Sequence, residues 1–501
     1  MGVPVGVRAN LSLALAQGRF DVVHGFEPGL PSLSYLALRE AGAIAVATFC
    51  STERLSYPPA RSQREKLLTR LDALIALSEP VRDAAAERFP GDYRLLSPGV
   101  DLDLFRPGGK KRVIAVELRP NERATAREIV KALRELPGWE AVLLRTKPLI
   151  GRPAIPRDLA GRVHLRTARS GVARARVLNE AAVFVPGLDG LDRILLEAKA
   201  AGCAIAAPRG VEAQPELAVA AAARLAEDDA LRAREGALAR REAEGQSFTD
   251  VAAELSELYS SLTERTRTKP RPRRRGVLAG RDWILVDLHM HTSWSFDCAI
   301  DPAELVDHAE AEGLGAIAVT DHNVFGGALE TADLARDRNL IVIPGEEVKT
   351  DGQGEVIGLF LEEEIPSGMS FADTIAAIRE QGGLVYLPHP FDRMHSIPEP
   401  ATLHRHLADI DVFEVYNARL LFDAQNDEAL RFARKYDLTA GAGSDAHVLQ
   451  GVGTGALRMR SFRDPEEFLI SLRSAEIVRR PKSLAYLQSL KWMAQVKEKV
   501  R

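Results

Sequence analysis

Cysteine is scarce in this chain. Its three cysteines, Cys50, Cys203 and Cys298, lie far apart and form no CxxC pair, so they cannot build a disulfide framework. No apolar run approaches the roughly 20 residues that a membrane-spanning helix needs, and the first residues, MGVPVGVRAN, contain no apolar signal-peptide core. We therefore expect a protein of a reducing compartment, the cytoplasm, without a membrane span.

A charge excess of one sign and a high aromatic content are also missing. The formal net charge is −4 and aromatic residues make up 6% of the chain, so the composition provides no global basic field and no aromatic-rich basic groove. Nucleic acid is therefore expected as a minor partner at most.

The length of the chain and one basic segment predict several domains. The 501 residues are too many for one core and predict two to four domains. The segment ERTRTKPRPRRRG (264–276) carries seven basic residues and two prolines and no apolar side chain. It cannot bury a face and predicts a solvated linker at 264–281. A basic arm that attracts phosphates is the alternative.

Before this linker, short apolar segments alternate with helix-like ones. FDVVHGF (20–26), RVIAVEL (112–118) and AAVFVPG (181–187) are typical of buried strands, and ATAREIVKALREL is typical of a helix. This alternation predicts an α/β fold with parallel sheets in two Rossmann-like units, at 1–107 and 108–263.

After the linker, side chains that can bind metals recur directly behind apolar strands. Nine of the eleven histidines lie between residues 289 and 447. The strand ends are ILVDL (284–288) before His289 and His291, GAIAVT (315–320) before Asp321 and His322, LIVI (340–343) before Glu346, GLVYLP (383–388) before His389, and DLTAGAG (437–443) before Asp445 and His447.

The recurrence predicts a metal centre. In a parallel α/β barrel the carboxyl ends of the strands converge on one rim, so these distant side chains would face one another. A single histidine at a strand end is usually structural, but five such strand ends are hard to explain by core packing. Histidine and carboxylate together suit zinc, manganese or iron.

Five motifs in this half, DLHMHT, AVTDHN, PGEEV, YLPHPFD and GAGSDAH, resemble in order those of the PHP family, named for polymerase and histidinol phosphatase. The resemblance covers about 283–460 and places a PHP domain at 282–480, followed by a C-terminal helix at 481–501. It implies a distorted, TIM-like (β/α)7 barrel that holds two or three divalent ions (Mn, Zn or Fe) and hydrolyses phosphate esters.

The resemblance also implies metal ligands residue by residue. Glu346 would be the carboxylate that bridges metals, and Asp297 stands where many relatives have histidine. One ligand of the metal held by Glu346 and His389 is not apparent, and Asn417, Asp411 and His406 remain candidates. The full set of implied metal ligands is His289, His291, Asp297, His322, Glu346, His389, Asp445 and His447.

Catalytic roles are expected for Glu346, Asp445 and Asp321. Asp321 would fix the tautomer of a histidine or, alternatively, cap a turn. Arg393 and Arg419 would hold the substrate phosphate, because a guanidinium matches phosphate geometry; surface arginines are the alternative. A metal-activated hydroxide would then attack the ester.

The first half resembles a different family. LLSPGVDLDLFRP (95–107), DGLDRILLEAKAAGCAIAAP (189–208) and FDVVHGFEPGLPS (20–32) resemble the family 4 glycosyltransferases of the GT-B fold, over about 10–260. The resemblance implies a nucleotide-sugar site with Glu197 on the donor ribose, Asp189 as the paired acid and Arg119 on the donor phosphates. The first strand and Gly-rich loop of that family and its phosphate-binding lysine are missing, so we expect a truncated, degenerate region that binds or scaffolds.

The sequence thus predicts a metal-dependent phosphoesterase that hydrolyses a small phosphomonoester or a nucleotide phosphate. Two alternatives stay open: a nucleotide-sugar-dependent glycosyltransferase with an accessory PHP domain, and a non-catalytic scaffold.

Overall fold

The computed structural model describes residues 5–18, 20–118, 123–146, 154–187, 193–206, 215–267, 278–392, 394, 396–480 and 483. These residues form α/β structure with three sheets, as predicted. They fall into two compact units. The first comprises Met1–Leu74, Ala84–Tyr93 and Ser261–Arg501, and the second comprises Ile75–Asp83 and Arg94–Ser260. The domain boundaries expected above stay predictions, because one compact unit can contain more than one domain.

The N-terminal sheet has four strands in the order β1-β2-β3-β4, and β1 pairs with β2 in parallel. Every residue of β2 is buried, which is typical of a parallel strand covered on both faces. The elements are α1 (Val5–Gly18), β1 (Val22–Phe26), α2 (Leu33–Glu40), β2 (Ile44–Phe49), α3 (Arg61–Leu68), β3 (Ala73–Ala76), α4 (Glu79–Ala86) and β4 (Tyr93–Leu95).

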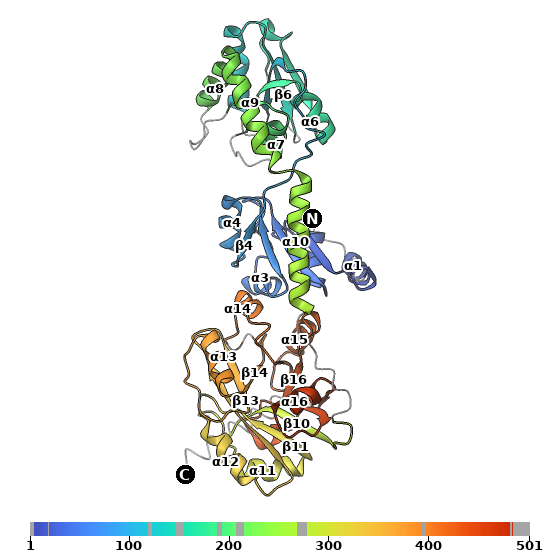
Figure 1. Ribbon diagram of the computed structural model, residues 1–501, viewed down its shortest axis with the longest axis vertical. Helices are drawn as coiled ribbons and strands as arrows, with labels where there is room; N and C mark the ends of the chain where they lie inside the picture. The colour runs from blue at the N-terminus through green and yellow to red at the C-terminus, as the bar shows by residue number, and fades with distance from the viewer. Residues whose placement is uncertain are drawn as a thin grey trace. The chain divides into compact units, whose positions relative to one another are not determined.

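The second unit contains a five-stranded parallel sheet in the order β7-β6-β5-β8-β9, with helices on both faces (Figure 1). Its elements are β5 (Lys111–Glu117), α5 (Arg123–Ala132), β6 (Glu140–Arg145), β7 (Val163–Thr167), α6 (Gly171–Leu178), β8 (Ala181–Val185), α7 (Arg193–Ala200), β9 (Ala204–Ile205), α8 (Pro215–Glu227) and α9 (Asp229–Glu244), and α10 (Phe248–Arg267) follows them.

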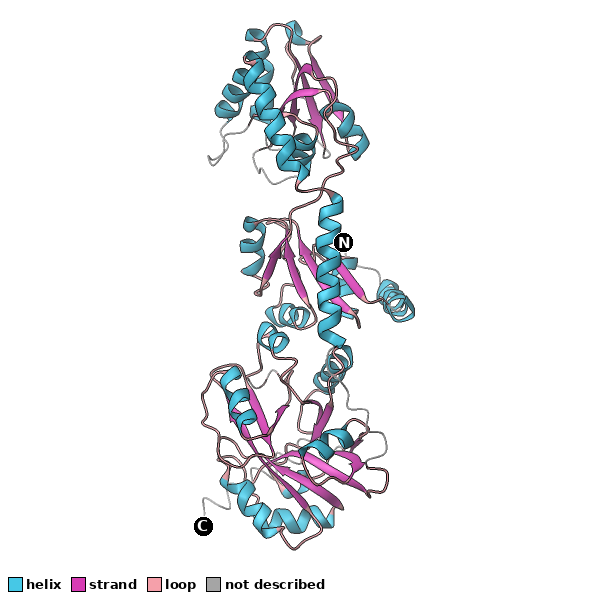
Figure 2. Ribbon diagram, viewed as in Figure 1, coloured by secondary structure: helices cyan, strands magenta, loops and turns pink. Residues whose placement is uncertain are grey.

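The C-terminal sheet has nine strands in the order β16-β15-β14-β13-β12-β11-β10-β17-β18, with helices around it (Figure 2). Strand β13 is antiparallel to both neighbours, whereas β10-β11-β12 and β14-β15-β16 are parallel. The strands are β10 (Trp283–Met290), β11 (Leu314–Val319), β12 (Ile341–Lys349), β13 (Glu355–Leu359), β14 (Leu384–Leu387), β15 (Val412–Asn417), β16 (Ala440–Gly443), β17 (Gly455–Arg460) and β18 (Glu476–Arg479). The helices are α11 (Pro302–Ala311), α12 (Gly326–Leu334), α13 (Phe371–Glu380), α14 (Pro400–Arg405), α15 (Asp423–Lys435) and α16 (Pro465–Leu472).

This sheet nearly closes into a barrel. Behind the end of β16, the Asp445 amide donates to the carbonyl of His289 (2.7 Å), and the His291 amide donates to the carbonyl of Ala446 (3.1 Å). These bonds join the last strand of the barrel to its first, β10. Glycine is needed for this approach, because a Cβ on Gly443 would lie 2.3 Å from the Cβ of His289.

Side chains far apart in the sequence meet within the first unit. Arg70, after α3, donates from Nε to Glu428 Oε1 on α15 (2.6 Å), and both side chains are nearly buried. Lys435 pairs with Asp72 (2.7 Å), and the Tyr436 hydroxyl donates to the same carboxylate (2.7 Å). Residues near the N-terminus therefore contact the barrel helix α15.

None of the helices in the described part of the chain combines the length and the apolar character that crossing a membrane requires. Most of the predicted linker and C-terminal helix lies outside the described residues.

Candidate metal centre

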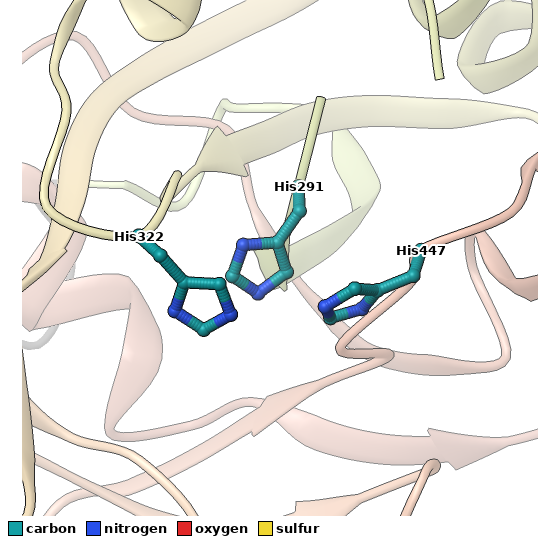
Figure 3. A group of neighbouring side chains, drawn as sticks. All are labelled: His291, His322 and His447. Carbon is teal, nitrogen blue, oxygen red and sulfur yellow. The ribbon is translucent and has the colours of Figure 1, made fainter. Parts of the chain in front are cut away.

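Three imidazoles from three strand ends face one another at the rim of the barrel (Figure 3). The ring centroids of His322 and His447 each lie 4.3 Å from that of His291, and the ligand atoms of the three residues lie within 4.8 Å of one another. They follow β10, β11 and β16, which is the convergence that the sequence predicted.

Glu347 joins these imidazoles to two others. Its Oε2 lies 3.1 Å from Nδ1 of His322 and 3.3 Å from Nε2 of His289. Its Oε1 lies 3.1 Å from Nε2 of His389. With both oxygens facing different imidazoles, Glu347 would be placed to hold a metal together with His289 and His389 or with His322.

Glu346, predicted to be the metal-bridging carboxylate, lies outside the cluster. Strand β12 continues through Pro344 to Lys349, so the two glutamates are consecutive residues of one strand and point to opposite faces. Glu346 Oε2 accepts from the Ile365 amide (2.9 Å), and its Oε1 is buried without a hydrogen-bond partner. Burial raises the pKa of Glu346 to about 7.

A buried carboxylate in the middle of β15 orients the ring of His289. Glu414 Oε1 lies 3.1 Å from His289 Nδ1 and accepts from the Tyr386 hydroxyl (2.8 Å). Its Oε2 accepts from the amide of His389 (2.6 Å) and from Nδ2 of Asn417 (3.1 Å). With Nδ1 donating to Glu414, His289 directs Nε2 toward Glu347.

Asp445 approaches the cluster from the last strand of the barrel, just behind the end of β16. Its Oδ1 lies 3.5 Å from His291 Nε2 and 3.9 Å from His289 Nε2. Arg419 donates from Nη1 to the same oxygen (3.0 Å) and lies 3.3 Å from His447 Nε2. Asp445 has a φ of 53°, a left-handed conformation that costs a non-glycine residue free energy and that aims its side chain into the site.

The loop after β10 carries Asp297 to the same rim. Asp297 Oδ2 lies 3.1 Å from His447 Nε2, and its Oδ1 lies 3.8 Å from His322 Nε2. Asp321 does not contact the imidazole of its neighbour at hydrogen-bond distance. It accepts instead from the amide of Thr292 (2.7 Å) and from the hydroxyl of Ser295 (2.6 Å), which anchors the loop.

Glu355 lies beside His389, where the sequence analysis left one metal ligand unassigned. Its Oε2 lies 3.8 Å from His389 Nε2, and it forms a candidate metal group with His322 and Glu347. Of the three residues considered for this place, Asn417 hydrogen-bonds to Glu414 and Asp445. The other two lie elsewhere: Asp411 pairs with Arg379, and His406 with Asp409.

The electrostatics of the site fit divalent cations. Burial disfavours a charged His289, but Glu347, Asp445 and Glu414 outweigh it and hold its pKa well above the ordinary value. Burial and the neighbouring His447 hold the pKa of His291 well below the ordinary value. His291 Nε2 is fully buried and has no hydrogen-bond partner, so its lone pair faces the carboxylates without a donor. The donor set, imidazole nitrogen with carboxylate oxygen, is one that zinc, manganese and iron accept.

Of the three residues predicted to bind a nucleotide-sugar, the described part of the chain includes Glu197. Glu197 on α7 is 1% exposed, and its carboxylate pairs with Arg174 and Arg193. Its oxygens are therefore already engaged by guanidinium groups. Asp189 and Arg119, together with the predicted phosphate ligand Arg393, lie outside the described residues.

The fold and the site define a β/α barrel with clustered candidate metal ligands, in a chain that also contains Rossmann-like sheets. The family model of the PHP domain matches residues 287–435, the one described as PHP-associated matches 423–477, and that of glycosyltransferase family 4 matches 3–104. Uncharacterized protein MJ0417 of Methanocaldococcus jannaschii is 34% identical over 212 residues, which cover 40% of this chain and 84% of that protein. The chain belongs to the PHP family, and both predicted resemblances are confirmed.

Two further similarities concern smaller or more distant matches. The 3',5'-nucleoside bisphosphate phosphatase of Chromobacterium violaceum is 35% identical over 98 residues, which cover 19% of this chain and 33% of that protein. The structure of HepE from Anabaena, determined with UDP, is 13% identical, covers 51% of this chain and 82% of that one, and has a TM-score of 0.39.

Proposed function

We propose that the barrel is a metal-dependent phosphoesterase that hydrolyses a small phosphomonoester or a nucleotide phosphate. The observation that carries the proposal is the buried group of facing imidazoles and carboxylates, in which His291 Nε2 has no hydrogen-bond partner. A phosphatase of nucleoside bisphosphates among the relatives supports the substrate class.

We assign the metal ligands by geometry, with Glu347 replacing Glu346. Glu414 and Ser295 would orient the imidazoles of His289 and His291 from behind. Bound divalent cations would lower the pKa of a coordinated water and neutralise phosphate charge. The proposed ligands are His289, His291, Asp297, His322, Glu347, Glu355, His389, Asp445 and His447.

Arg419 is the proposed phosphate ligand. It is the cation that faces Asp445 and His447 in the described part of the site, and its side chain is 30% exposed. One nitrogen is held by Asp445, which fixes the plane of the guanidinium and leaves its remaining donors for phosphate oxygens.

The full chain, purified and loaded with manganese, tests the proposal. We expect bound metal by elemental analysis and hydrolysis of p-nitrophenyl phosphate, with both lost in His291→Ala and Asp445→Ala. The matched control is His164→Ala, a histidine of β7 paired with Glu140 at the surface. Hydrolysis that survives both site changes contradicts the proposal, and so does a chain that binds no metal.

The glycosyltransferase alternative has less structural support. The Glu197 carboxylate, which would have to hold a ribose, is paired with two arginines. Saturable binding of a UDP-sugar that is lost in Glu197→Ala would favour this alternative.

A further inference from the structure

Exposed aromatic side chains occur on the loop that follows β10, beside the metal cluster. Phe296 is 88% exposed, more than any other large apolar side chain in the described part of the chain, and Trp294 is 48% exposed. Keeping an aromatic ring in water forgoes the free energy of its burial. Two such rings on one short loop at the mouth of a polar site indicate a surface that contacts a ligand.

The loop that carries these rings is held firmly. Asp321 anchors it by accepting from Thr292 and Ser295. The Trp294 indole donates from Nε1 to Glu330 on α12 (2.7 Å). The indole also lies directly against the start of α12, where a Cβ on Gly326 would approach it to 2.4 Å. The exposed rings are therefore presented by a fixed backbone.

Phe296 stands at the edge of the cluster itself. Its ring centroid lies 5.7 Å from that of His322, and the next residue, Asp297, contacts His447 at 3.1 Å. A ligand group that leaves the cluster past His322 would therefore pass close to an exposed aromatic ring. Flat aromatic groups stack on the face of such a ring, and every nucleobase is such a group.

We propose that Phe296 is a specificity-determining residue that stacks on the base of a nucleotide, so that base-bearing phosphate esters are the substrate class of this site. The inference rests on the proposed function for the place of the phosphate, which lies at the cluster. Free nucleotides and the phosphorylated end of a strand share this chemistry.

Equilibrium binding to the manganese-loaded full chain tests the inference. Calorimetric titrations use adenosine monophosphate, inorganic phosphate and a 5'-phosphorylated oligonucleotide. We expect Phe296→Ala to weaken binding of adenosine monophosphate about tenfold and to leave inorganic phosphate unchanged, while Phe296→Tyr restores the affinity. Phe248→Ala, a half-exposed phenylalanine of the other compact unit, is the matched control and should change neither.

The outcomes separate this inference from the proposed function. Equal weakening of nucleotide and phosphate overturns the stacking role, as does an unchanged affinity for both nucleotide probes. Failure of the unaltered chain to bind either probe overturns it too. Weakening of the oligonucleotide alone supports stacking at a strand end. If the chain hydrolyses no ester, the proposed function fails, yet the ratio of nucleotide to phosphate affinity still decides the role of Phe296.

Discussion

At the scale of single residues, two adjacent glutamates have opposite environments. Glu347 contacts His289, His322 and His389, and these contacts with His289 and His322 outweigh burial and hold its pKa well below the ordinary value. Glu346 accepts from the Ile365 amide instead, and burial raises its pKa to about 7. Glu347 therefore lies in the cluster of candidate metal ligands and Glu346 lies outside it, because successive side chains of a strand face opposite sides.

Exchanging each glutamate for glutamine tests this difference. We expect Glu347→Gln to lose bound metal and to lower hydrolysis about 100-fold or more, since it removes a charged oxygen shared by several imidazoles. Glu346→Gln should keep its metal, because that carboxylate faces the Ile365 amide instead. Elemental analysis and initial rates on both variants give the answer, and metal loss in Glu346→Gln would refute the assignment.

Glu414 acts behind the ligands, so its replacement should have a smaller effect. Asn417 and Tyr386 donate hydrogen bonds to it, and in Glu414→Gln the new amide nitrogen would face these donors. We expect metal affinity to fall about 10- to 100-fold while the stoichiometry at saturating metal stays the same. Competition with a metal chelator measures the affinity. Glu140→Gln, in the surface pair with His164, is the control and should have no effect.

At the scale of elements, the direction of a strand decided what the sequence could predict. His322, His389 and Asp445 were foreseen because they follow parallel strands, whose carboxyl ends share one rim, and His289 lies at the same end as the next-to-last residue of β10. Glu355 begins β13, which runs antiparallel and so brings its amino end to that rim. Nothing in the local pattern GEVIGL marks that reversal.

Strand length limited the prediction in the same way. The predicted strand LIVI (340–343) stops before the glutamates, whereas β12 continues through Pro344 to Lys349, so the alternation of faces within the strand was not available to separate Glu346 from Glu347. Glu414 was missed because it lies inside a strand rather than behind one. The fold class and most imidazoles were thus predictable from periodicity, but carboxylates within strands depended on tertiary register.

Strand β16 can approach β10 closely because Gly443 has no side chain. Gly443→Ala would place a methyl group 2.3 Å from the His289 Cβ and 3.0 Å from Glu414 Oε1. We expect bound metal to fall at least by about half with every ligand present, and the free energy of unfolding to fall by about 1–3 kcal/mol. Elemental analysis and urea denaturation measure these effects. Gly280→Ala, which meets open space, should change neither, and a normal metal content in Gly443→Ala would contradict the close approach.

At the scale of the whole molecule, buried ion pairs connect the N-terminal residues to the barrel. Arg70 and Glu428 are 358 positions apart in the sequence, a separation over which no local pattern predicts contact. Breaking one partner of a buried pair leaves an uncompensated charge, which costs about 3–5 kcal/mol. The segment around Arg70 and Asp72 therefore stabilises α15 rather than merely preceding the barrel.

Glu428→Gln should destabilise the chain in a pH-dependent manner. Burial disfavours the charged Glu428, but Arg70 outweighs it and lowers the Glu428 pKa below its ordinary value of 4.5. A lowered carboxyl pKa stabilises the fold above pH 4.5, and this contribution is lost as the pH falls through the folded-state pKa. The difference in unfolding free energy between wild type and variant should therefore be about 3–5 kcal/mol at pH 7 and shrink below pH 4.5.

Urea denaturation followed by circular dichroism at several pH values measures this difference. Glu180→Gln breaks the exposed pair with Lys111 and should cost only about 0–1 kcal/mol. A pH-independent difference for Glu428→Gln would show that the pair contributes packing rather than charge.

The bonds between the first and last barrel strands have a consequence for biosynthesis. A ribosome makes His289 and His291 long before Asp445 and His447, and backbone bonds at Asp445 and Ala446 join the two ends of the cluster. Translation must therefore run past His447 before the cluster can be completed. Capture of the cations would then be a closing event of maturation, and a nascent chain stalled short of that point would emerge without a finished centre.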